Sequence, residues 1–345
     1  MKIEVYSPTV RRKEMDAVLT AMVEDSLGPG EHTQFLVHTA KEHFAFDYCL
    51  ALRTPAFALQ LALETLKAGA SGDGNAQGVI ISALAPLYYD RVIRSLGLLP
   101  LYCDTGEDTP LAAEQKIEVL MGSRPLCAVI THSLGYMPSP DLAAELGVPV
   151  IEDASQSFGA LWGEKKAGTA GNFTILGLEE RDMITAGGGA LLFAMNRKDA
   201  ALLRGMGELP PEFLLPGVNA AMAAVQFRES GKNLLKRREL AQAYTQASLQ
   251  TRHKRFSQAE GLDYNNYAFP LVIESGVKDI KAYARRKEII VEEAFESSLV
   301  GSGLIPAVQC PCAASLALRT LLFPLYPRLS AAQAGEVAKL IATLP

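Results

Sequence analysis

Apolar residues along the chain follow two periods, one typical of helices and one typical of buried strands. Five of them at i, i+3, i+4, i+7 and i+8 spacing predict an amphipathic first helix: Met15, Val18, Leu19, Met22 and Val23. The turn 28–30 follows it. A second helix is predicted around 59–66, and it closes into a flexible loop at 70–75 that is rich in glycine and small polar residues.

Short apolar runs then alternate with turns or helix-like stretches. These runs cover 79–83, 100–103, 127–131, 148–151, 173–176 and 190–194. Their length and the apolar character of both faces are typical of parallel strands buried beneath crossover helices. The first two thirds of the chain are therefore predicted to form an α/β layer domain around a mostly parallel sheet.

The last third has a different pattern. Segment 208–217 carries prolines that break regular structure, and a polar helix rich in Lys and Arg is predicted at 232–249. Beyond it we expect a small α+β region, with the following elements: strand 267–273, helix 277–286, strand 289–291 and a last helix opened by a Ser330/Gln333 capping box. The predicted domains are a large one at 1–235 and a small C-terminal one at 236–345.

Composition narrows the class of protein. The 345 residues are 49% hydrophobic, which allows a large core, and the net charge of −5 provides no basic field for nucleic acid or an acidic membrane. The first ten residues hold no apolar signal-peptide core and no run is long enough to span a membrane, so we expect a soluble, cytoplasmic protein. The odd number of cysteines predicts reduced thiols, with Cys310 and Cys312 in a loop.

Candidate chemistry gathers after the predicted strands. Segment 151–160 places Asp153 and Gln156 at the end of a buried strand, where open α/β sheets bind ligands. An Asp there either pairs with a cation, a metal or a protonated ring nitrogen, or caps the next helix. The glycines at 187–189 suit either a tight turn or a close backbone approach. His132, just after another strand, is more typical of a hydrogen-bonded core residue than of a catalyst.

The order of these motifs resembles the DegT/DnrJ/StrS family of pyridoxal-phosphate-dependent sugar aminotransferases, which have fold type I. The matching segments, in chain order, are 26–30, 58–63, 100–104, 129–135, 152–156, 163–168, 219–222 and 323–329. The resemblance implies a PLP-transferase fold, an α/β large domain with a small C-terminal α+β domain, and a homodimer. It also implies pyridoxal phosphate as cofactor and a keto-sugar nucleotide as substrate.

Three residues match the roles of that family. Asp153 matches the carboxylate that keeps the pyridine nitrogen protonated, which makes the ring an electron sink. Gln156 matches the amide near the ring oxygen. Asn219 matches the asparagine that reaches across the dimer interface to the cofactor phosphate.

Other family positions have changed. Counting back from Gly187, the Schiff-base lysine falls on Asp182, which has no amine and forms no imine. The phosphate-capping serine falls on Gly177.

The family's phosphate loop reads Thr54, Pro55, Ala56 in this chain, and Pro55 lacks the N–H that would cradle a phosphate. The ring-stacking aromatic falls on Pro86, with Tyr88 or Tyr89 as substitutes if the register shifts. The arginine after the interface asparagine falls on Ala221. The candidate cofactor contacts are thus Asp153, Gln156, Asn219, Thr54, Ala56 and Gly177, and no residue is assigned as catalytic.

Two functions remain open. The first is a homologue that no longer transaminates and acts as a binding or regulatory protein in nucleotide-sugar or surface-polysaccharide metabolism. The second is a working aminotransferase that uses a displaced lysine or a non-covalent cofactor. Against it, Lys165 and Lys166 lie in a hairpin predicted to be polar and solvated, and Lys198 follows a strand end. The acidic stretch 179–182 either receives a cation or an amine-bearing ligand, or is a solvated turn; we expect no metal there.

Overall fold

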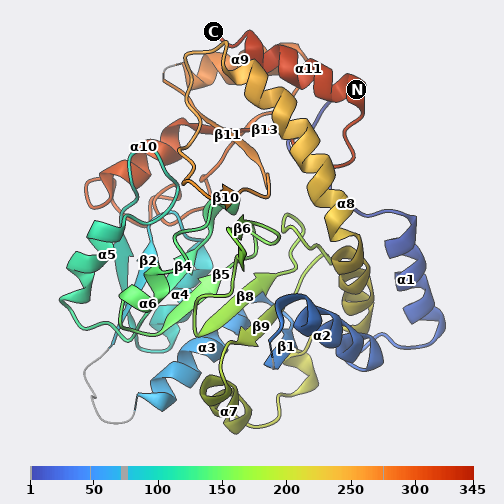
Figure 1. Ribbon diagram of the computed structural model, residues 1–345, viewed down its shortest axis with the longest axis vertical. Coiled ribbons are helices and arrows are strands. Elements are labelled where there is room, and N and C mark those ends of the chain that lie inside the picture. The colour runs from blue at the N-terminus through green and yellow to red at the C-terminus, as the bar shows by residue number, and fades with distance from the viewer. Residues whose placement is uncertain (1, 47, 71–76, 275) are drawn as a thin grey trace.

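The structure of the chain is a computed structural model that describes residues 2–46, 48–70, 77–274 and 276–345 (Figure 1). Most of the loop predicted at 70–75 therefore lies outside the described residues. Within the described part, seven strands form one sheet in the order β1-β9-β8-β5-β4-β2-β3. Their bounds are β1 Tyr48–Leu52, β2 Gly78–Ser82, β3 Leu99–Cys103, β4 Cys127–Thr131, β5 Val150–Asp153, β8 Phe173–Gly177 and β9 Ala190–Ala194.

The prediction of an α/β fold with a mostly parallel sheet is confirmed, with one correction. Strands β3, β2, β4, β5 and β8 pair in parallel, but β9 runs antiparallel to β8 and β1 antiparallel to β9. The prediction that 190–194 is a parallel strand is wrong because no helix crosses over between Gly177 and Ala190; instead the left-handed glycines Gly187, Gly188 and Gly189 turn the chain back. Strand β1 was not predicted.

Helices cover both faces of this sheet (Figure 1). On one face, Leu59 and Leu63 of α3 (Pro55–Gly69) are fully buried in the same core as Ile81 and Ile151. The opposite face is covered by α2 (Glu31–Phe44) and α8 (Gly217–Ser248), while Ile80 packs with α5 (Glu114–Met121). The remaining elements around the sheet are α4 Leu87–Ser95, η1 Ser133–Gly135, α6 Leu142–Glu145, α7 Arg197–Gly205 and η2 Pro211–Phe213.

A smaller antiparallel sheet with its own core forms the C-terminal part. It consists of β11 (Phe269–Val272), β13 (Thr320–Phe323) and β12 (Glu292–Glu293), with α9 (Val277–Arg286) and α11 (Ala331–Ala342) packed against it. The Ser330/Gln333 capping box is confirmed, with N to O distances of 3.0 and 3.2 Å. The strand predicted at 289–291 is displaced to 292–293, since Ile289 forms only an isolated bridge to Ile3. A third small sheet contains β6 Leu161–Trp162, β7 Lys165–Lys166 and β10 Leu262–Asp263.

One helix, α8 (Gly217–Ser248), runs from the large sheet to the small one (Figure 1). It begins fifteen residues before the predicted start at 232. The sequence did not predict this first part because Ala220, Ala223 and Ala224 are small, are buried in the core beside α2 and give no polar helical pattern. The predicted boundary at 235/236 falls inside this helix and remains a prediction.

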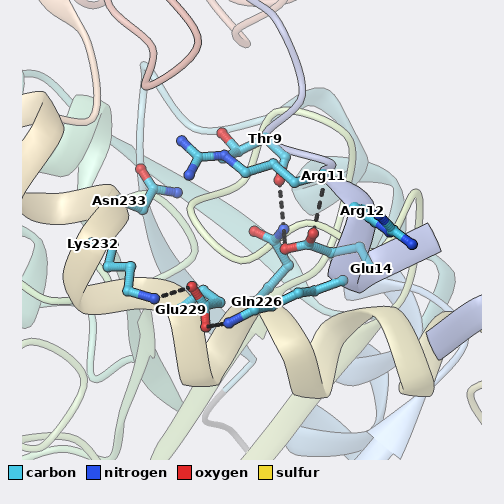
Figure 2. A pocket seen from close by; sticks show the side chains of 9 residues that line it. Thr9, Arg11, Arg12, Glu14, Gln226, Glu229, Lys232 and Asn233 are labelled. Carbon is cyan, nitrogen blue, oxygen red and sulfur yellow. Dashed lines mark hydrogen bonds and ion pairs between the residues drawn. The ribbon is translucent and has the colours of Figure 1, made fainter. Parts of the chain in front are cut away.

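Helix α1 (Arg12–Val23) lies along α8 and is held there by polar contacts (Figure 2). Gln226 of α8 donates to Glu14 Oε1 at 2.8 Å and to the Thr9 carbonyl at 2.7 Å. Glu229 pairs with Lys13 at 2.6 Å and with Lys232 at 2.7 Å. These side chains line a pocket of about 270 Å³. The helix was predicted, but it buries Glu14 and Ala21 rather than its apolar stripe.

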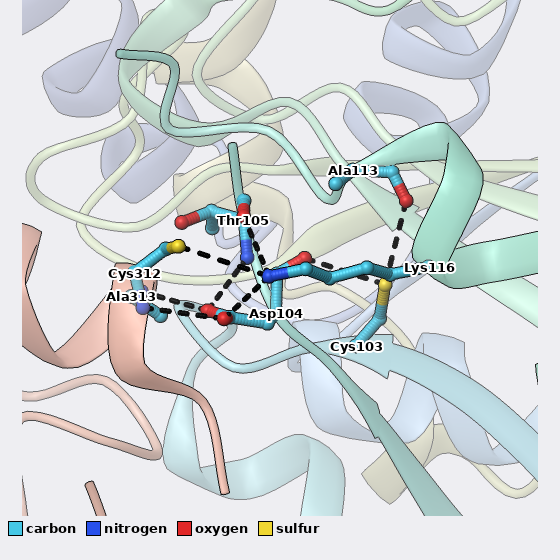
Figure 3. A network of polar contacts seen from close by, with 7 residues as sticks. All are labelled: Cys103, Asp104, Thr105, Ala113, Lys116, Cys312 and Ala313. Carbon is cyan, nitrogen blue, oxygen red and sulfur yellow. Dashed lines mark hydrogen bonds and ion pairs between the residues drawn. The ribbon is translucent and has the colours of Figure 1, made fainter. Parts of the chain in front are cut away.

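Asp104, at the end of β3, joins the large sheet to α10 (Pro311–Arg319) (Figure 3). Its carboxylate accepts hydrogen bonds from the backbone N–H groups of Cys312 and Ala313, at 3.2 and 2.7 Å, and from Lys116 Nζ at 2.7 Å. Cys310 caps α10 and Cys312 lies inside it, so the prediction of a loop there is wrong: Pro311 at the first helical position starts a helix. All five cysteines are free thiols.

No helix in the described part of the chain is both long and apolar enough to cross a membrane.

Candidate functional site

A cavity of about 180 Å³ opens at the carboxyl ends of the parallel strands β4, β5 and β8. Residues that follow each strand line it: Thr131 and Ser133 after β4, Asp153 and Gln156 at the end of β5, and Asp182 after β8. Segment 294–298 closes it from the C-terminal part, and Leu299 N–H donates to the Ala85 carbonyl at 3.0 Å. This is the place where open α/β sheets bind ligands.

Asp153 is a buried carboxylate with three donors. Tyr89, which is completely buried, donates its hydroxyl to Oδ2. Ser155 donates its backbone N–H at 3.0 Å and its hydroxyl at 2.5 Å to Oδ1. Asp153 thus caps the turn at Ser155 and also faces the cavity, and its pairing with a cation, a metal or a protonated ring nitrogen stays a prediction. Its charge is satisfied from within the protein.

Gln156 also faces the cavity, and its Oε1 accepts the Leu134 N–H at 2.6 Å. Leu134 holds a left-handed backbone conformation with φ of 54°. The hydrogen bond helps to hold this turn, because non-glycine residues disfavour positive φ. Gln156 thus shapes the cavity wall.

Asp182 is half-buried at the cavity edge, in the turn after β8. Its Oδ2 accepts the Glu179 N–H at 2.8 Å. Burial raises the pKa of Asp182 to about 8, and the negative charges of Asp153 and Glu179 act in the same direction, while the Glu179 N–H opposes them. The carboxyl group of Asp182 lies directly against Gly177, where a Cβ would collide with Oδ2. Only glycine leaves this space free.

His132 is a core residue, as its sequence position suggested. It is buried beside the cavity, its Nδ1 lies 2.7 Å from Ser157 Oγ, and its Nε2 lies 3.2 Å from Glu152 Oε2. Glu152 in turn accepts the N–H groups of Ala170 and Gly171 at 2.6 and 2.5 Å. Burial alone raises the pKa of Glu152, but the His132 contact and these N–H donors outweigh it and lower the pKa. The pair fixes the loop after β7 to the sheet.

The structure brings together only part of the predicted contact set. Asp153 and Gln156 line the cavity, and Gly177 lies against its edge. Thr54 instead caps α3 by accepting the Phe57 N–H at 3.1 Å, and Ala56 does not line the cavity. Asn219 donates to the Ala186 carbonyl at 2.8 Å, outside the cavity.

Of the aromatic alternatives near Pro86, Tyr88 lines the cavity beside Pro86, whereas Tyr89 points into the core to reach Asp153. Sequence reasoning did not find Ser133 or segment 294–298. Ser133 is 4% exposed and lines the cavity, and its hydroxyl has no partner among the described residues. No sequence signal predicts that segment 294–298 lies at the site, since only the folding of the C-terminal part brings this segment to the cavity.

The electrostatics of the cavity are one-sided. Asp153, Glu179 and Asp182 line it, and no Lys or Arg of the described chain does. The nearest arginine in sequence, Arg181, turns away and pairs with Glu292 at 2.8 Å. An anionic ligand group inside this cavity meets carboxylates without a compensating cation.

A central mostly parallel sheet, a long helix leading to a small C-terminal sheet and a cavity at the strand ends define the architecture of fold type I aminotransferases. The chain belongs to the DegT/DnrJ/EryC1/StrS aminotransferase family, whose sequence profile matches residues 8–342. The PLP-transferase fold and the family resemblance predicted from the sequence are both confirmed.

Curated relatives agree with this family. The chain is 23% identical over 318 residues to the putative pyridoxal phosphate-dependent aminotransferase EpsN of Bacillus subtilis, covering 84% of this chain and 80% of that protein. It is 28% identical over 240 residues to GDP-perosamine synthase of Caulobacter vibrioides, covering 65% and 62%. A match to L-glutamine:2-deoxy-scyllo-inosose aminotransferase of Streptomyces fradiae has 26% identity and covers 51% of this chain and only 41% of that relative.

Solved structures share the fold. The putative sugar aminotransferase Spr1654 of Streptococcus pneumoniae superimposes with a TM-score of 0.88 at 14% identity, covering 99% of this chain and 97% of that one. The aminotransferase TlmJ of Streptoalloteichus hindustanus gives 0.86 at 21% identity, covering 99% and 98%.

The lining residues can be compared with the chemical groups that the family cofactor, pyridoxal phosphate, requires. It needs an amine for the imine link and donors for a phosphate monoester that carries about −1.5 to −2 charges at pH 7. Here Asp182 has no amine, Pro55 has no N–H, and Tyr89 already occupies one oxygen of Asp153. The lining residues of this chain do not fit the cofactor.

Proposed function

We propose that this chain is a member of the DegT/DnrJ/EryC1/StrS family that no longer transaminates and serves as a binding or regulatory protein in nucleotide-sugar metabolism. The observation that carries the proposal is the cavity lining: a carboxylate, Asp182, in the position expected for the lysine, and no Lys or Arg among the described residues that line the cavity. Without an amine there is no transimination.

The size and polarity of the cavity support a sugar as ligand. Its volume of about 180 Å³ is below the ~300–1,000 Å³ of sites that enclose whole drug-sized ligands, so one ring fits and a nucleotide does not. Hydrogen-bonding groups line it, among them Ser133, Gln156 and Tyr88, and these suit ring hydroxyls. We expect the nucleotide to remain outside, away from the carboxylates. The names of the relatives, such as GDP-perosamine synthase, support the same ligand class.

The alternative, an active aminotransferase with a displaced lysine, finds little support. Lys165 Nζ pairs with Asp141 at 2.7 Å, and Lys166 Nζ donates to the His43 carbonyl. Both are exposed on β7, and Lys198 is exposed on α7. Of the described lysines, none lines the cavity.

Cofactor titration tests the proposal. The protein is mixed with pyridoxal phosphate, its visible spectrum is recorded, and intact mass is measured after borohydride reduction. We expect no shifted aldimine band and no cofactor adduct. A stoichiometric adduct on a single lysine would overturn the proposal and identify the displaced lysine.

A gain-of-function variant sharpens this test. Asp182→Lys supplies an amine but leaves Pro55 and the absence of lining cations unchanged, so we expect no transamination of keto-sugar nucleotides with amino donors. Recovery of activity by this single change would show that the rest of the cofactor site is intact.

A further inference from the structure

Asp182 has one unused carboxylate oxygen in a cavity that no Lys or Arg of the described chain lines. Its Oδ2 accepts the Glu179 N–H, whereas Oδ1 has no partner among the described residues. Asp153 differs, because Tyr89 and Ser155 satisfy both of its oxygens. Among the lining carboxylates that are at least partly buried, Asp182 is therefore the one that lacks a counterpart.

A second group in the same cavity is also unsatisfied. Ser133 lines the cavity and is only 4% exposed, and its hydroxyl has no hydrogen-bond partner in the described chain. Its oxygen is not fully enclosed by protein, so the hydroxyl can exchange a hydrogen bond with a polar ligand group. Tyr88 adds an aromatic ring to the lining, and aromatic rings attract cations.

We infer that the cavity is a receptor for a protonated primary amine carried on a sugar ring, with Asp182 holding the ammonium group. The inference rests on the proposed function and specifies its ligand as an amino sugar. An ammonium group offers three donors and one positive charge, which matches a free carboxylate oxygen, a free hydroxyl and an uncompensated acidic lining. A neutral sugar matches the hydroxyl but forms no charge-assisted hydrogen bond with Asp182.

A metal ion matches this cavity less well. No group of three His, Cys, Asp or Glu residues in the described chain is placed to hold one. Divalent cations take about six or more oxygen ligands, and Asp153 already uses its oxygens on internal donors.

Negative charges and hydroxyl groups surround Asp182, and two arginines on neighbouring segments are engaged elsewhere. The charges of Asp153 and Glu179 act on it, and burial raises the pKa values of Tyr6, Tyr88 and Tyr267, to which the charge of Asp182 adds. On the same turn, Arg181 is engaged by Glu292. On α8, Arg237 is buried and donates to the Tyr267 carbonyl at 2.6 Å. An ammonium ligand supplies the missing positive charge.

Calorimetry with matched sugars tests the inference. Hexoses that carry a primary amine at C2, C3 or C4 are titrated into the protein at pH 7 and compared with the parent hexose. We expect at least one amino sugar to bind about tenfold or more tighter than its parent, as charge-assisted hydrogen bonds predict. Binding should also release protons from Asp182, which is seen as a heat that depends on the ionisation enthalpy of the buffer.

Two variants locate the effect. Asp182→Asn keeps the shape and an oxygen acceptor for Glu179 but removes the charge, so it should abolish both the amine preference and the buffer-dependent heat. Glu180→Gln removes a charge from the same turn, at a residue that does not line the cavity. It should therefore leave both the amine preference and the buffer-dependent heat unchanged. Unfolding of each variant by heat is checked first, so that loss of binding is not loss of fold.

The outcomes separate the two proposals. If none of the three amino sugars is preferred over its parent, or if Asp182→Asn retains the preference, the amine receptor is overturned. In that case, binding of a neutral nucleotide sugar without a cofactor adduct would still support the proposed function. A lysine-linked cofactor adduct would overturn the proposed function whatever the sugars do.

Discussion

At the scale of single residues, Asp182 and Gly177 behave as one unit. A Cβ on Gly177 would meet Asp182 Oδ2 and come within 2.9 Å of Ser155 Oγ. A side chain at position 177 and the carboxylate at position 182 therefore compete for the same space. The two departures that the family resemblance implies, serine to glycine at position 177 and lysine to aspartate at position 182, are thus expected to be coupled by packing.

A double-mutant cycle tests this coupling. Gly177→Ala alone should destabilise the fold by about 1–3 kcal/mol, because it overpacks the end of β8 against Asp182 and Ser155. In an Asp182→Ala background the collision is relieved, so the same change should cost less than half as much. Urea unfolding of the four proteins measures both values.

Gly335→Ala is the matched control for this cycle. It adds a methyl group inside α11, where nothing lies within 4 Å, and should stabilise the protein by roughly 0.5–1 kcal/mol. Equal costs of Gly177→Ala in the two backgrounds would show that the two positions are uncoupled.

Asp182 also makes a prediction about pH. Its pKa is about 8 in the folded chain, mainly because of burial, and 3.8 in the unfolded reference, so the folded state binds the proton more tightly. Its contribution to stability is fully present below pH 3.8 and is lost as pH rises through about 8. Asp182→Asn mimics the protonated form, so it should change little at pH 4 and should stabilise the protein at pH 8 by on the order of 1 kcal/mol or more.

Denaturant unfolding at the two pH values measures this difference, with Glu180→Gln as the exposed control. A stabilisation by Asp182→Asn that is equal at pH 4 and pH 8 would contradict a raised pKa in the folded state.

The sequence could place some site residues and not others, for a physical reason. Asp153 and Gln156 follow a strand that local pattern alone identifies, so their position at the sheet edge is predictable. The depth of Asp182 depends on the turn 178–189, which folds back because of three left-handed glycines. Ser133 and segment 294–298 meet only through long-range packing, and no local signal encodes that contact.

At the scale of elements, α10 is fixed to the large sheet through Asp104 (Figure 3). Burial alone raises the pKa of Asp104, but the Lys116 ammonium and the N–H groups of Ala313, Cys312 and Thr105 outweigh it and hold the pKa below its usual value. The stability that this carboxylate supplies is therefore present at neutral pH and is lost as pH falls through its folded-state pKa.

Asp104→Ala should detach the start of α10. It leaves three N–H groups and Lys116 without their acceptor, so we expect a loss of about 2–4 kcal/mol. Hydrogen exchange should show the amides of residues 312–319 losing protection more than those of β4. Glu107→Gln, an exposed neighbour, is the control. Unchanged protection of α10 in Asp104→Ala would mean that apolar packing alone holds the helix.

Elements also differ in how well their patterns predict them. Strands β2, β4 and β8 were placed within a residue or two because their runs are apolar on both faces. The direction of a strand could not be predicted in the same way, since segment 190–194 has the same composition whether it runs parallel or antiparallel to its neighbour. The start of α8 was not predicted because Gly217 and four buried alanines give no alternation of polar and apolar residues with the helical period.

At the scale of the whole molecule, the apolar stripe of α1 is the main feature that the single chain leaves unexplained. Met15, Leu19 and Val23 are 57%, 59% and 76% exposed, and Met22 and Leu27 are also exposed, at 54% and 52%. Exposed apolar surface of this kind marks interaction sites. The homodimer expected from the family resemblance would give this stripe a partner, a second copy of the chain.

We therefore predict that the protein is a homodimer in solution and that α1 contributes to its interface. The pair Met15→Glu and Leu19→Glu places charges on the stripe without touching Glu14 or Ala21, the buried side of the helix. It should shift the light-scattering mass from dimer to monomer at micromolar concentration, because burying two unpaired carboxylates opposes association. Val308→Glu, at an apolar position that is 88% exposed and remote in sequence from α1, should leave the dimer unchanged. A wild-type chain that is monomeric throughout the micromolar range would contradict the dimer, and a dimer that survives both charges would place its interface on another face.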